Sequence, residues 1–428
     1  MTALSRLLDS ATRRDFLRLA AFGATGASVS GWLDIVAQRA YAQEVATRAR
    51  AKACIVLFMS GGPAHTFTFD LKGGDRGCPY EPINTTAPGI QISEHLPKVA
   101  EQMHHLALVR GMSTEIADHE PAHYLMRTGF RQEAGLTHPH FGATALSQLI
   151  REDNGLPNFV LLKPGSGDAS RGCTAGFLPP NCRPMILQDI ARGIANLQPP
   201  GGTQAVRNRF GLLENADETF LNEYQDEAIR AHLAGYRSAL QLMDLRAAQE
   251  AFRIDKEPLH VRAAYGDTPF GRQCLGARRL IEHGVRFVEV MHPQYWDTHG
   301  GAVNGQRNLS QTLDRPMGAL IEDLHQRGLL DETLVVWMGE FGRTYDGNDH
   351  YARAWTTAFA GAGVRGGRAI GRTDNRGMTV TDRPVRVPDF VATILKTLGV
   401  NHTRRTNVRG RPVGFVDGDA RPLDELFA

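Results

Sequence analysis

Side chains that bind metal ions gather at three points of this chain, and each point follows an apolar run. In chain order they are His119 and His123 after residues 106–109, Asp297 and His299 after residues 285–291, and Glu340, Asp349 and His350 after residues 333–338. Carboxylate oxygens and imidazole nitrogens that converge on one point hold a divalent cation. Such an ion can activate a water molecule, so the pattern predicts a metal-dependent hydrolytic site.

The apolar runs are typical of buried parallel strands, and helical patterns lie between them. The runs are residues 53–59, 106–109, 159–162, 285–291 and 333–338, and the helical patterns are residues 141–150, 271–282, 309–327 and 388–398. This alternation predicts an α/β fold with a mostly parallel central sheet and helices on both faces. Ligands of open α/β sheets bind beyond the carboxyl ends of the strands, so we expect the three groups to meet at that edge.

The first group lies at the start of a predicted helix. Pro121 suits the first turn of a helix that runs to about Arg127, with Asp118 or His119 as its cap. His119 and His123 then share one face of the helix, and a phosphate or sulfate would be favoured at its N-terminus. In the alternative reading, Asp118 only caps the helix and His123 only packs.

The first 42 residues have the features of an export signal. Thr12-Arg13-Arg14-Asp15-Phe16-Leu17 is a twin-arginine motif, a weakly apolar stretch covers residues 19–33, and Ala40-Tyr41-Ala42 is a candidate cleavage site. The stretch is shorter than the roughly 20 apolar residues of an ordinary membrane span, although an anchor or a chance amphipathic helix is the alternative. We therefore expect the twin-arginine translocase to export the folded protein, which becomes periplasmic or secreted and keeps no stable membrane span.

The charge and the length of the chain are ordinary for an exported α/β protein. Without the leader the chain has 48 − 5 = 43 basic and 46 − 3 = 43 acidic residues, so net charge gives no reason to expect nucleic acid or anionic lipid as a partner. Residues 43–428 fit one α/β domain with insertions. A helical insertion is expected at about residues 205–255, after an irregular loop at residues 164–205.

The five cysteines are too few and too irregularly spaced to predict a disulfide scaffold. Cys173 and Cys182 lie in a loop rich in Gly and Pro and could pair after export. Cys54 lies inside an apolar run and is expected to be an inert core residue.

Several motifs resemble a family of bacterial proteins. They are Ser60-Gly61-Gly62-Pro63 with Phe69-Asp70, Trp296-Asp297-Thr298-His299-Gly300, Met338-Gly339-Glu340-Phe341-Gly342-Arg343-Thr344, Val387-Pro388-Asp389-Phe390 and Pro422-Leu423-Asp424-Glu425-Leu426-Phe427. In this order, over essentially the whole chain after the leader, they resemble the twin-arginine-exported, sulfatase-like proteins, a domain of unknown function in the alkaline phosphatase superfamily. The resemblance implies an alkaline-phosphatase-like three-layer sandwich with the site at its sheet edge.

Four positions depart from the pattern of the superfamily. In the nucleophile segment of sulfatases, His119 falls on the nucleophile and His123 on the activating arginine. Glu340 stands where superfamily members have an Asp-His pair, and Ser60 stands where the first strand normally ends in a metal-binding Asp. No Cys or hydroxyl occupies the nucleophile position, so the resemblance does not imply formylglycine chemistry.

Two catalytic routes follow from these residues. In the first, zinc, manganese or calcium held by Asp297, His299, Glu340 and His350 activates a water, with His119 as general acid or base. In the second, His119 is itself the nucleophile and forms a phospho- or sulfo-histidine. The first route needs no unusual intermediate and is preferred.

Three further residues have two readings each. Arg343 binds the anionic group of the substrate or pairs with Glu340, and Asp70 is a metal ligand or simply ends the first loop. Asp349 is a ligand or orients His350.

The sequence thus predicts an exported metal-dependent hydrolase that acts on a small phosphate or sulfate ester. The alternative from another class is a non-catalytic binding or assembly protein that retains the fold. A third reading leaves the His and Asp residues as scattered surface groups.

Overall fold

The computed structural model describes residues 50–149, 155–163, 171–194, 201–224 and 246–428, with 233, 235–237, 239–240 and 242–243 between them. The chain divides into two units, Met1–Arg48 and Ala49–Ala428. The predicted leader, residues 1–42, lies outside the described residues, and the structure below is that of the second unit.

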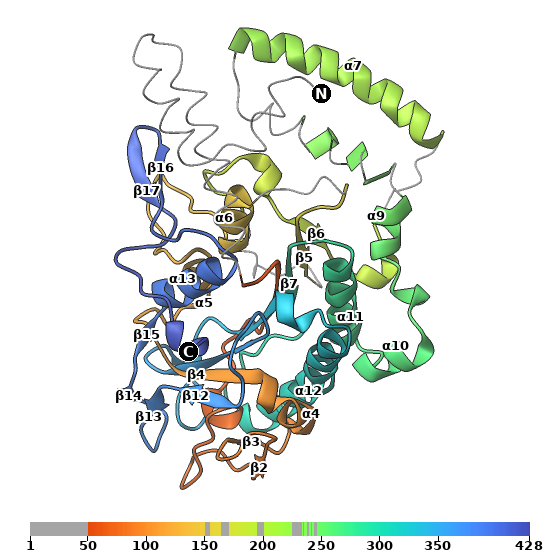
Figure 1. Ribbon diagram of the computed structural model, residues 1–428. Coiled ribbons are helices and arrows are strands. Elements are labelled where there is room, and N and C mark those ends of the chain that lie inside the picture. The colour runs from red at the N-terminus through yellow and green to blue at the C-terminus, as the bar shows by residue number, and fades with distance from the viewer. Residues whose placement is uncertain are drawn as a thin grey trace, which may run out of the picture. The chain divides into compact units, whose positions relative to one another are not determined.

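A nine-stranded sheet forms the centre of this unit (Figure 1). Its order is β12 (Arg368–Ile370), β4 (Leu106–Ser113), β11 (Trp355–Ala360), β8 (Thr333–Met338), β1 (Ala53–Phe58), β7 (Phe287–Met291), β5 (Phe159–Leu162) and β6 (Met185–Leu187), with β15 (Val385–Arg386) also beside β4. All neighbours are parallel except β11, which is antiparallel to β8 and to β4. The predicted mostly parallel sheet is confirmed.

Strand β1 shows why the apolar runs are continuous. Its side chains alternate between two apolar layers, with Ile55 and Leu57 on one side and Cys54, Val56 and Phe58 on the other. All six residues of the strand are buried. A strand covered on both faces has no solvent side, so its sequence needs no polar alternation.

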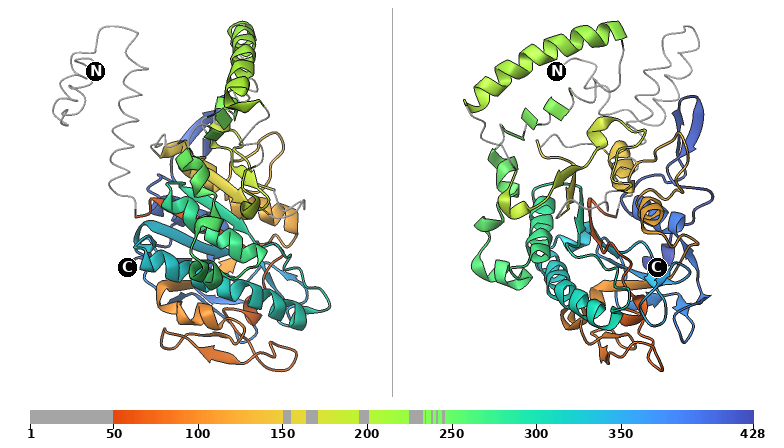
Figure 2. Two further views of the ribbon diagram at one scale, coloured as in Figure 1. Left: turned by 90° about the vertical axis from the view of Figure 1, so that its right-hand side faces the viewer. Right: turned by 180° about the vertical axis from the view of Figure 1, so that it is seen from behind.

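Helices cover both faces of the sheet (Figure 2). The layer that contains Ile55 is closed by α4 (Pro97–Glu101), α10 (Leu259–Tyr265), α11 (Pro269–Glu282) and α12 (Ala302–Gln326). The opposite layer is closed by α5 (His119–Thr128), α6 (Phe141–Gln148) and α13 (Val387–Thr397). The three-layer α/β architecture expected from the sequence is therefore observed.

The remaining helices lie where the helical insertion was expected. They are α7 (Gly202–Tyr224) and α9 (Arg246–Ala251), and much of the chain between them is outside the described residues. The predicted irregular loop before them contains the edge strand β6, which the sequence analysis missed. Cys173 and Cys182 are free thiols, so they do not form the disulfide considered above. None of the described helices has the length and apolar character needed to cross a membrane.

Four short two-stranded ribbons complete the unit. They are β2 (Pro82–Asn84) with β3 (Gln91–Ser93), β9 (Gly342–Arg343) with β10 (His350–Tyr351), β13 (Arg372–Thr373) with β14 (Val380–Asp382), and β16 (Arg405–Val408) with β17 (Arg411–Gly414). The β9–β10 ribbon follows β8 and sets His350 opposite Arg343. It thereby returns His350 to the carboxyl edge of the sheet.

Candidate metal centre

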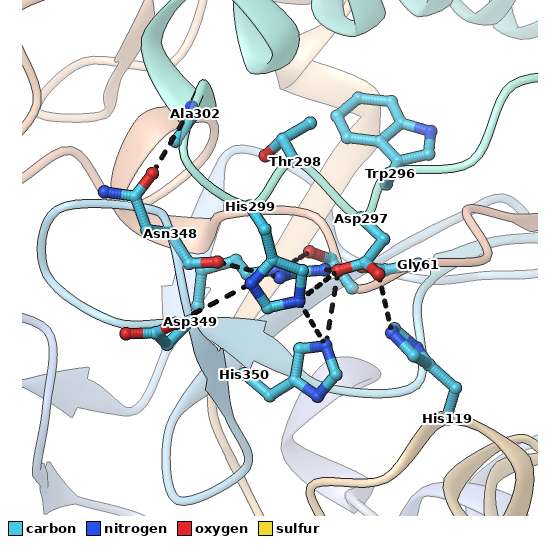
Figure 3. A network of polar contacts seen from close by, with 12 residues as sticks. Gly61, His119, Trp296, Asp297, Thr298, His299, Ala302, Asn348, Asp349 and His350 are labelled. Atoms are coloured by element: carbon cyan, nitrogen blue, oxygen red, sulfur yellow. Dashed lines mark hydrogen bonds and ion pairs between the residues drawn. The ribbon is translucent and has the colours of Figure 1, made fainter.

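Three imidazole rings face the carboxylate of Asp297, as Figure 3 shows. The Nε2 atoms of His299 and His350 lie 2.9 and 3.2 Å from Asp297 Oδ1. The Nε2 atom of His119 lies 3.4 Å from the other oxygen, Oδ2. These residues come from the loop after β7, the ribbon after β8 and the helix after β4, so folding gathers one side chain or more from each of the three predicted groups.

Each ring also has an acceptor near its other nitrogen, Nδ1. The distances are 2.6 Å from His119 Nδ1 to Glu340 Oε1, 2.8 Å from His350 Nδ1 to the Ala117 carbonyl oxygen, and 3.6 Å from His299 Nδ1 to Asp349 Oδ1. The acceptors at hydrogen-bond distance, beside His119 and His350, hold the proton on Nδ1 and leave the lone pair of Nε2 free. Histidines that bind metal ions show this arrangement, because the second partner fixes both tautomer and ring orientation.

Glu340 is fully buried one residue beyond Gly339, at the end of β8. Its Oε1 atom accepts a hydrogen bond from the Gly61 backbone N–H at 2.8 Å and lies 3.1 Å from His123 Nε2, in addition to its contact with His119. Burial alone would raise the pKa of Glu340, but the charges and hydrogen bonds of His123 and His119 outweigh burial and lower it. The carboxylate therefore stays ionised and orients His119.

The donor set fits a bound cation. His119, Asp297 and His350 offer atoms within 4.8 Å of one another, and so do His119, His123 and Glu340. His119 Nε2 and Glu340 Oε2 are buried, and neither has a hydrogen-bond partner in the described part of the chain. The Nε2 atoms of His299 and His350 lie 3.0 Å apart, close enough for one cation to bind both nitrogens. A cation bound by Asp297 and the three imidazoles would give His119 Nε2 a partner, and a set of nitrogens with one carboxylate suits zinc better than manganese or calcium.

Gly61 brings the end of β1 against the loop that carries Asp297. Its φ is 111°, and a Cβ atom at this position would lie 2.5 Å from the Asp297 backbone nitrogen and still closer to that of Trp296. No side chain fits at that distance, so the Gly61 position requires glycine. From the sequence, this segment stood out only as one of the motifs of the family resemblance.

Arg343 is bound by the protein itself. Its buried guanidinium donates to the carbonyl oxygens of Gly62 at 2.9 Å, Asn348 at 3.0 Å and Gly61, and to Asp297 Oδ1 at 2.5 Å. Burial would raise the pKa of Asp297, but the hydrogen bond and charge of Arg343 lower it. Neither reading of Arg343 matches this geometry, since it pairs with Asp297 rather than Glu340 and its buried side chain gives four of its five N–H groups to protein acceptors.

His123 lies behind His119, away from Asp297. It is 3% exposed, its Nε2 atom is 2.9 Å from Ser60 Oγ, and the edge of its ring meets the ring of Phe58. Ser60 therefore contacts the group, although the sequence analysis did not select it as a site residue. The resemblance had given a signal, because it implies a metal-binding Asp at the position of Ser60.

Two of the predicted ligands have other surroundings. Asp70 is buried, and its carboxylate accepts from Thr373 Oγ1 at 2.5 Å and pairs with Lys72 at 3.2 Å and Arg110 at 3.5 Å. The structure thus does not bring Asp70 into the group around Asp297. Asp349 is 77% exposed and lies near His299 rather than orienting His350, whose Nδ1 meets the Ala117 carbonyl.

A second buried polar cluster lies further along α5. His119, His123 and Arg127 recur every four residues on this helix, and Arg127 donates to Glu289 Oε1 through Nε at 3.0 Å and Nη2 at 2.5 Å. His140 Nε2 is 2.8 Å from Glu289 Oε2. Burial raises the pKa of Glu289, but the charge of Arg127 and the hydrogen bond of His140 bring it down to about 2. The signal in the sequence was a lone carboxylate inside an apolar strand.

Tyr295 forms part of the outer wall of the centre. Its ring lies 5.1 Å from that of His119, and 47% of the residue is exposed. Burial, followed by the negative charges of Glu340 and Asp297, raises the pKa of its phenol. Nothing in the spacing of the sequence marked this residue.

Solved structures with a related chain path include hydrolases and a synthase. The phosphonate monoester hydrolase of Agrobacterium radiobacter is 11% identical, with 88% of this chain and 77% of that chain covered and a TM-score of 0.41. The PsFucS1 sulfatase from Pseudoalteromonas sp. is 11% identical, with coverages of 85% and 72% and a TM-score of 0.39. The lipoteichoic acid synthase LtaP from Listeria monocytogenes is 10% identical, with coverages of 86% and 75% and a TM-score of 0.39.

A comparison with curated protein sequences found no match. A family model, in contrast, matches residues 51–427, which include every residue of the centre described above. This chain belongs to the family described as Protein of unknown function (DUF1501).

Proposed function

We propose that this protein is an exported metal-dependent hydrolase of a phosphate or sulfate ester. The observation that carries the proposal is the convergence of the Nε2 atoms of His119, His299 and His350 on the Asp297 carboxylate. Zinc is the proposed ion, because nitrogen donors predominate. The export route rests on the leader sequence alone.

Each residue of the centre has a proposed role. Asp297 and the three imidazoles hold the ion, Glu340 orients His119, and Arg343 holds the Asp297 carboxylate in place. When bound, the ion supplies a Lewis acid and a water of lowered pKa at neutral pH. His119 thus serves as a ligand, whereas a role as general acid, general base or covalent nucleophile would need its Nε2 atom free.

A non-catalytic metal-binding or assembly protein is the second candidate, and one observation favours it. Arg343, the cation expected to bind an anionic ester, has its donors engaged by three backbone carbonyls and Asp297. Because Arg343 is engaged in this way, it adds little to the stabilisation that the ion would give the charge of a phosphoryl or sulfuryl group.

Metal analysis followed by an ester assay separates these candidates. The protein without residues 1–42 is purified from medium with zinc or manganese, its metal content is measured, and hydrolysis of aryl phosphate, phosphodiester and sulfate esters is followed. Stoichiometric metal with turnover that disappears in His350→Ala supports the hydrolase. Stoichiometric metal without turnover of any ester favours the second candidate, and so does a protein that binds no metal and hydrolyses no ester, which would contradict the hydrolase.

The route of export has its own test. A precursor whose Arg13 and Arg14 are both changed to Lys is expected to stay in the cytoplasm, while the unchanged precursor is processed and exported. Export of the variant at the normal level would contradict the twin-arginine route.

A further inference from the structure

The β16–β17 hairpin concentrates positive charge that the neutral net balance conceals. From residue 390 to residue 416 the sequence contains no Asp or Glu. The same stretch contains Arg404, Arg405, Arg409 and Arg411, all of them in or beside the hairpin. The charges of the chain are thus balanced overall but segregated locally.

Three of these guanidinium groups face solvent without an acidic partner. Arg405, Arg409 and Arg411 are exposed, and none of them forms an ion pair within the described residues. Other exposed arginines of the unit do have such partners, as in the pairs Arg131–Glu115, Arg192–Asp189 and Arg421–Asp419. The register sets Arg405 opposite Gly414 and Arg411 opposite Val408, so these two side chains leave opposite faces of the ribbon and reach a common partner at its edge or tip. An anionic partner there would offset the positive charge of the hairpin.

The tip of the hairpin places one of these charges at the outermost position. Arg409 and Gly410 form the two-residue turn, and their φ values are 50° and 82°. Turns with positive φ at both central residues favour Asn-Gly, and a long side chain is uncommon at the first position. The Gly410 N–H donates to Asn407 Oδ1 at 2.7 Å, so the turn is held in shape from within.

The base of the hairpin is fixed to the core. Phe415 and Val416 follow β17 and are buried, and the Phe415 N–H donates to the Arg404 carbonyl oxygen at 3.2 Å. Arg404 also donates to Gln148 at the end of α6. Within the described residues β16 and β17 pair only with each other, and Figure 1 shows the hairpin extending away from the central sheet. The arm therefore presents its charges at a fixed place with both edges uncovered.

We propose that the β16–β17 hairpin is a basic arm that holds the protein at the surface of an anionic phospholipid membrane. Headgroup phosphates form a dense two-dimensional array that several guanidinium groups can contact together. Single-stranded nucleic acid is a poorer partner, because residues 401–414 contain no Phe, Tyr or Trp on which bases would stack. The proposal does not depend on the function proposed for the metal centre.

Vesicle sedimentation tests the arm. The protein without residues 1–42 is mixed with vesicles of equal parts phosphatidylglycerol and phosphatidylcholine, or of phosphatidylcholine alone, at low and at high salt. Removing the leader is necessary because its own arginines would bind the vesicles. The test variant is Arg405→Ser, Arg409→Asn and Arg411→Ser together. The control variant replaces Arg131, Arg192 and Arg421 by Ser, which changes the net charge equally.

We expect the wild type and the control to sediment with the anionic vesicles at low salt, and to be released at high salt. Each basic residue near an anionic surface strengthens binding about five-fold, so the test variant is expected to bind on the order of a hundred-fold more weakly. Its metal content and thermal unfolding are expected to match the wild type, which excludes a folding defect.

Three results would overturn the proposal. They are absence of sedimentation by the wild type, equal loss in the test and control variants, and binding to duplex DNA through the same arginines that is tighter than binding to vesicles at equal phosphate concentration. The last result would make nucleic acid the partner of the arm.

Discussion

Replacement of Glu340 by Gln tests whether a buried carboxylate prepares His119 for an ion. The variant keeps the shape of the side chain but removes its charge, while Gly61, His119 and His123 still meet it. Loss of a carboxylate behind a ligating histidine typically lowers metal affinity 10- to 100-fold. This range corresponds to about 1.4–2.7 kcal/mol, which agrees with the roughly 1.5–3 kcal/mol of a hydrogen bond to a charged group.

The affinity is measured by titrating the metal-free protein with zinc in competition with a chromophoric chelator. Urea unfolding of the metal-free variant shows separately how far the substitution disturbs the fold. Asp349→Asn is the matched control, because Asp349 is 77% exposed and its oxygen lies 3.6 Å from His299 Nδ1. Its effect on affinity is expected to be at most about three-fold, since exposed pairs contribute little. Zinc affinity of Glu340→Gln equal to that of the wild type would refute this reasoning.

Three other measurements address the fold and the centre. Gly61→Ala is expected to lower the free energy of unfolding by about 3 kcal/mol or more, measured in urea, because a Cβ atom would strike the Trp296 backbone at a φ of 111°. Removal of the metal by a chelator is expected to lower the Tm of the wild type but not that of His350→Ala. The reason is that an ion present at a hundred times its Kd adds about 2.7 kcal/mol to the free energy of unfolding. The lowered pKa of Glu289 adds about 3 kcal/mol to the free energy of unfolding above pH 4.5, and this stabilisation is lost as the pH falls towards 2. In a combined Arg127→Met and Glu289→Leu variant, the free energy of unfolding is expected to fall less steeply with acid. A slope equal to that of the wild type would contradict the assignment.

The sequence predicted the strands and the edge of the sheet because these depend on patterns within short segments. The five apolar runs became β1, β4, β5, β7 and β8, each buried along its length or nearly so. Asp297, His299 and His350 follow the ends of such strands, so topology alone brings them to one edge. Strand β11 escaped prediction because Thr356 and Thr357 interrupt its apolar run, although both are buried.

The partners of individual side chains could not be predicted in this way. Arg343 has Glu340 as a near neighbour in sequence, but the β9–β10 ribbon directs its guanidinium towards Asp297 and the Gly61 carbonyl. Asp70 lies within reach of Lys72 and Arg110, and β4 supplies Arg110 from a distant part of the sequence. These outcomes depend on rotamers and on tertiary contacts, and neither has a signal in residue spacing.

Helix α5 ties the metal centre to the interior of the protein. One stripe of the helix carries His119, His123 and Arg127, and these side chains meet the carboxylates of Glu340, just beyond β8, and of Glu289 on β7. A slip of the helix by a single residue would rotate it by about 100° and separate all three contacts together. The helix therefore either keeps all three contacts or loses them together. Binding of a metal ion by the outer ligands is expected to slow hydrogen exchange of the amides two turns further along α5.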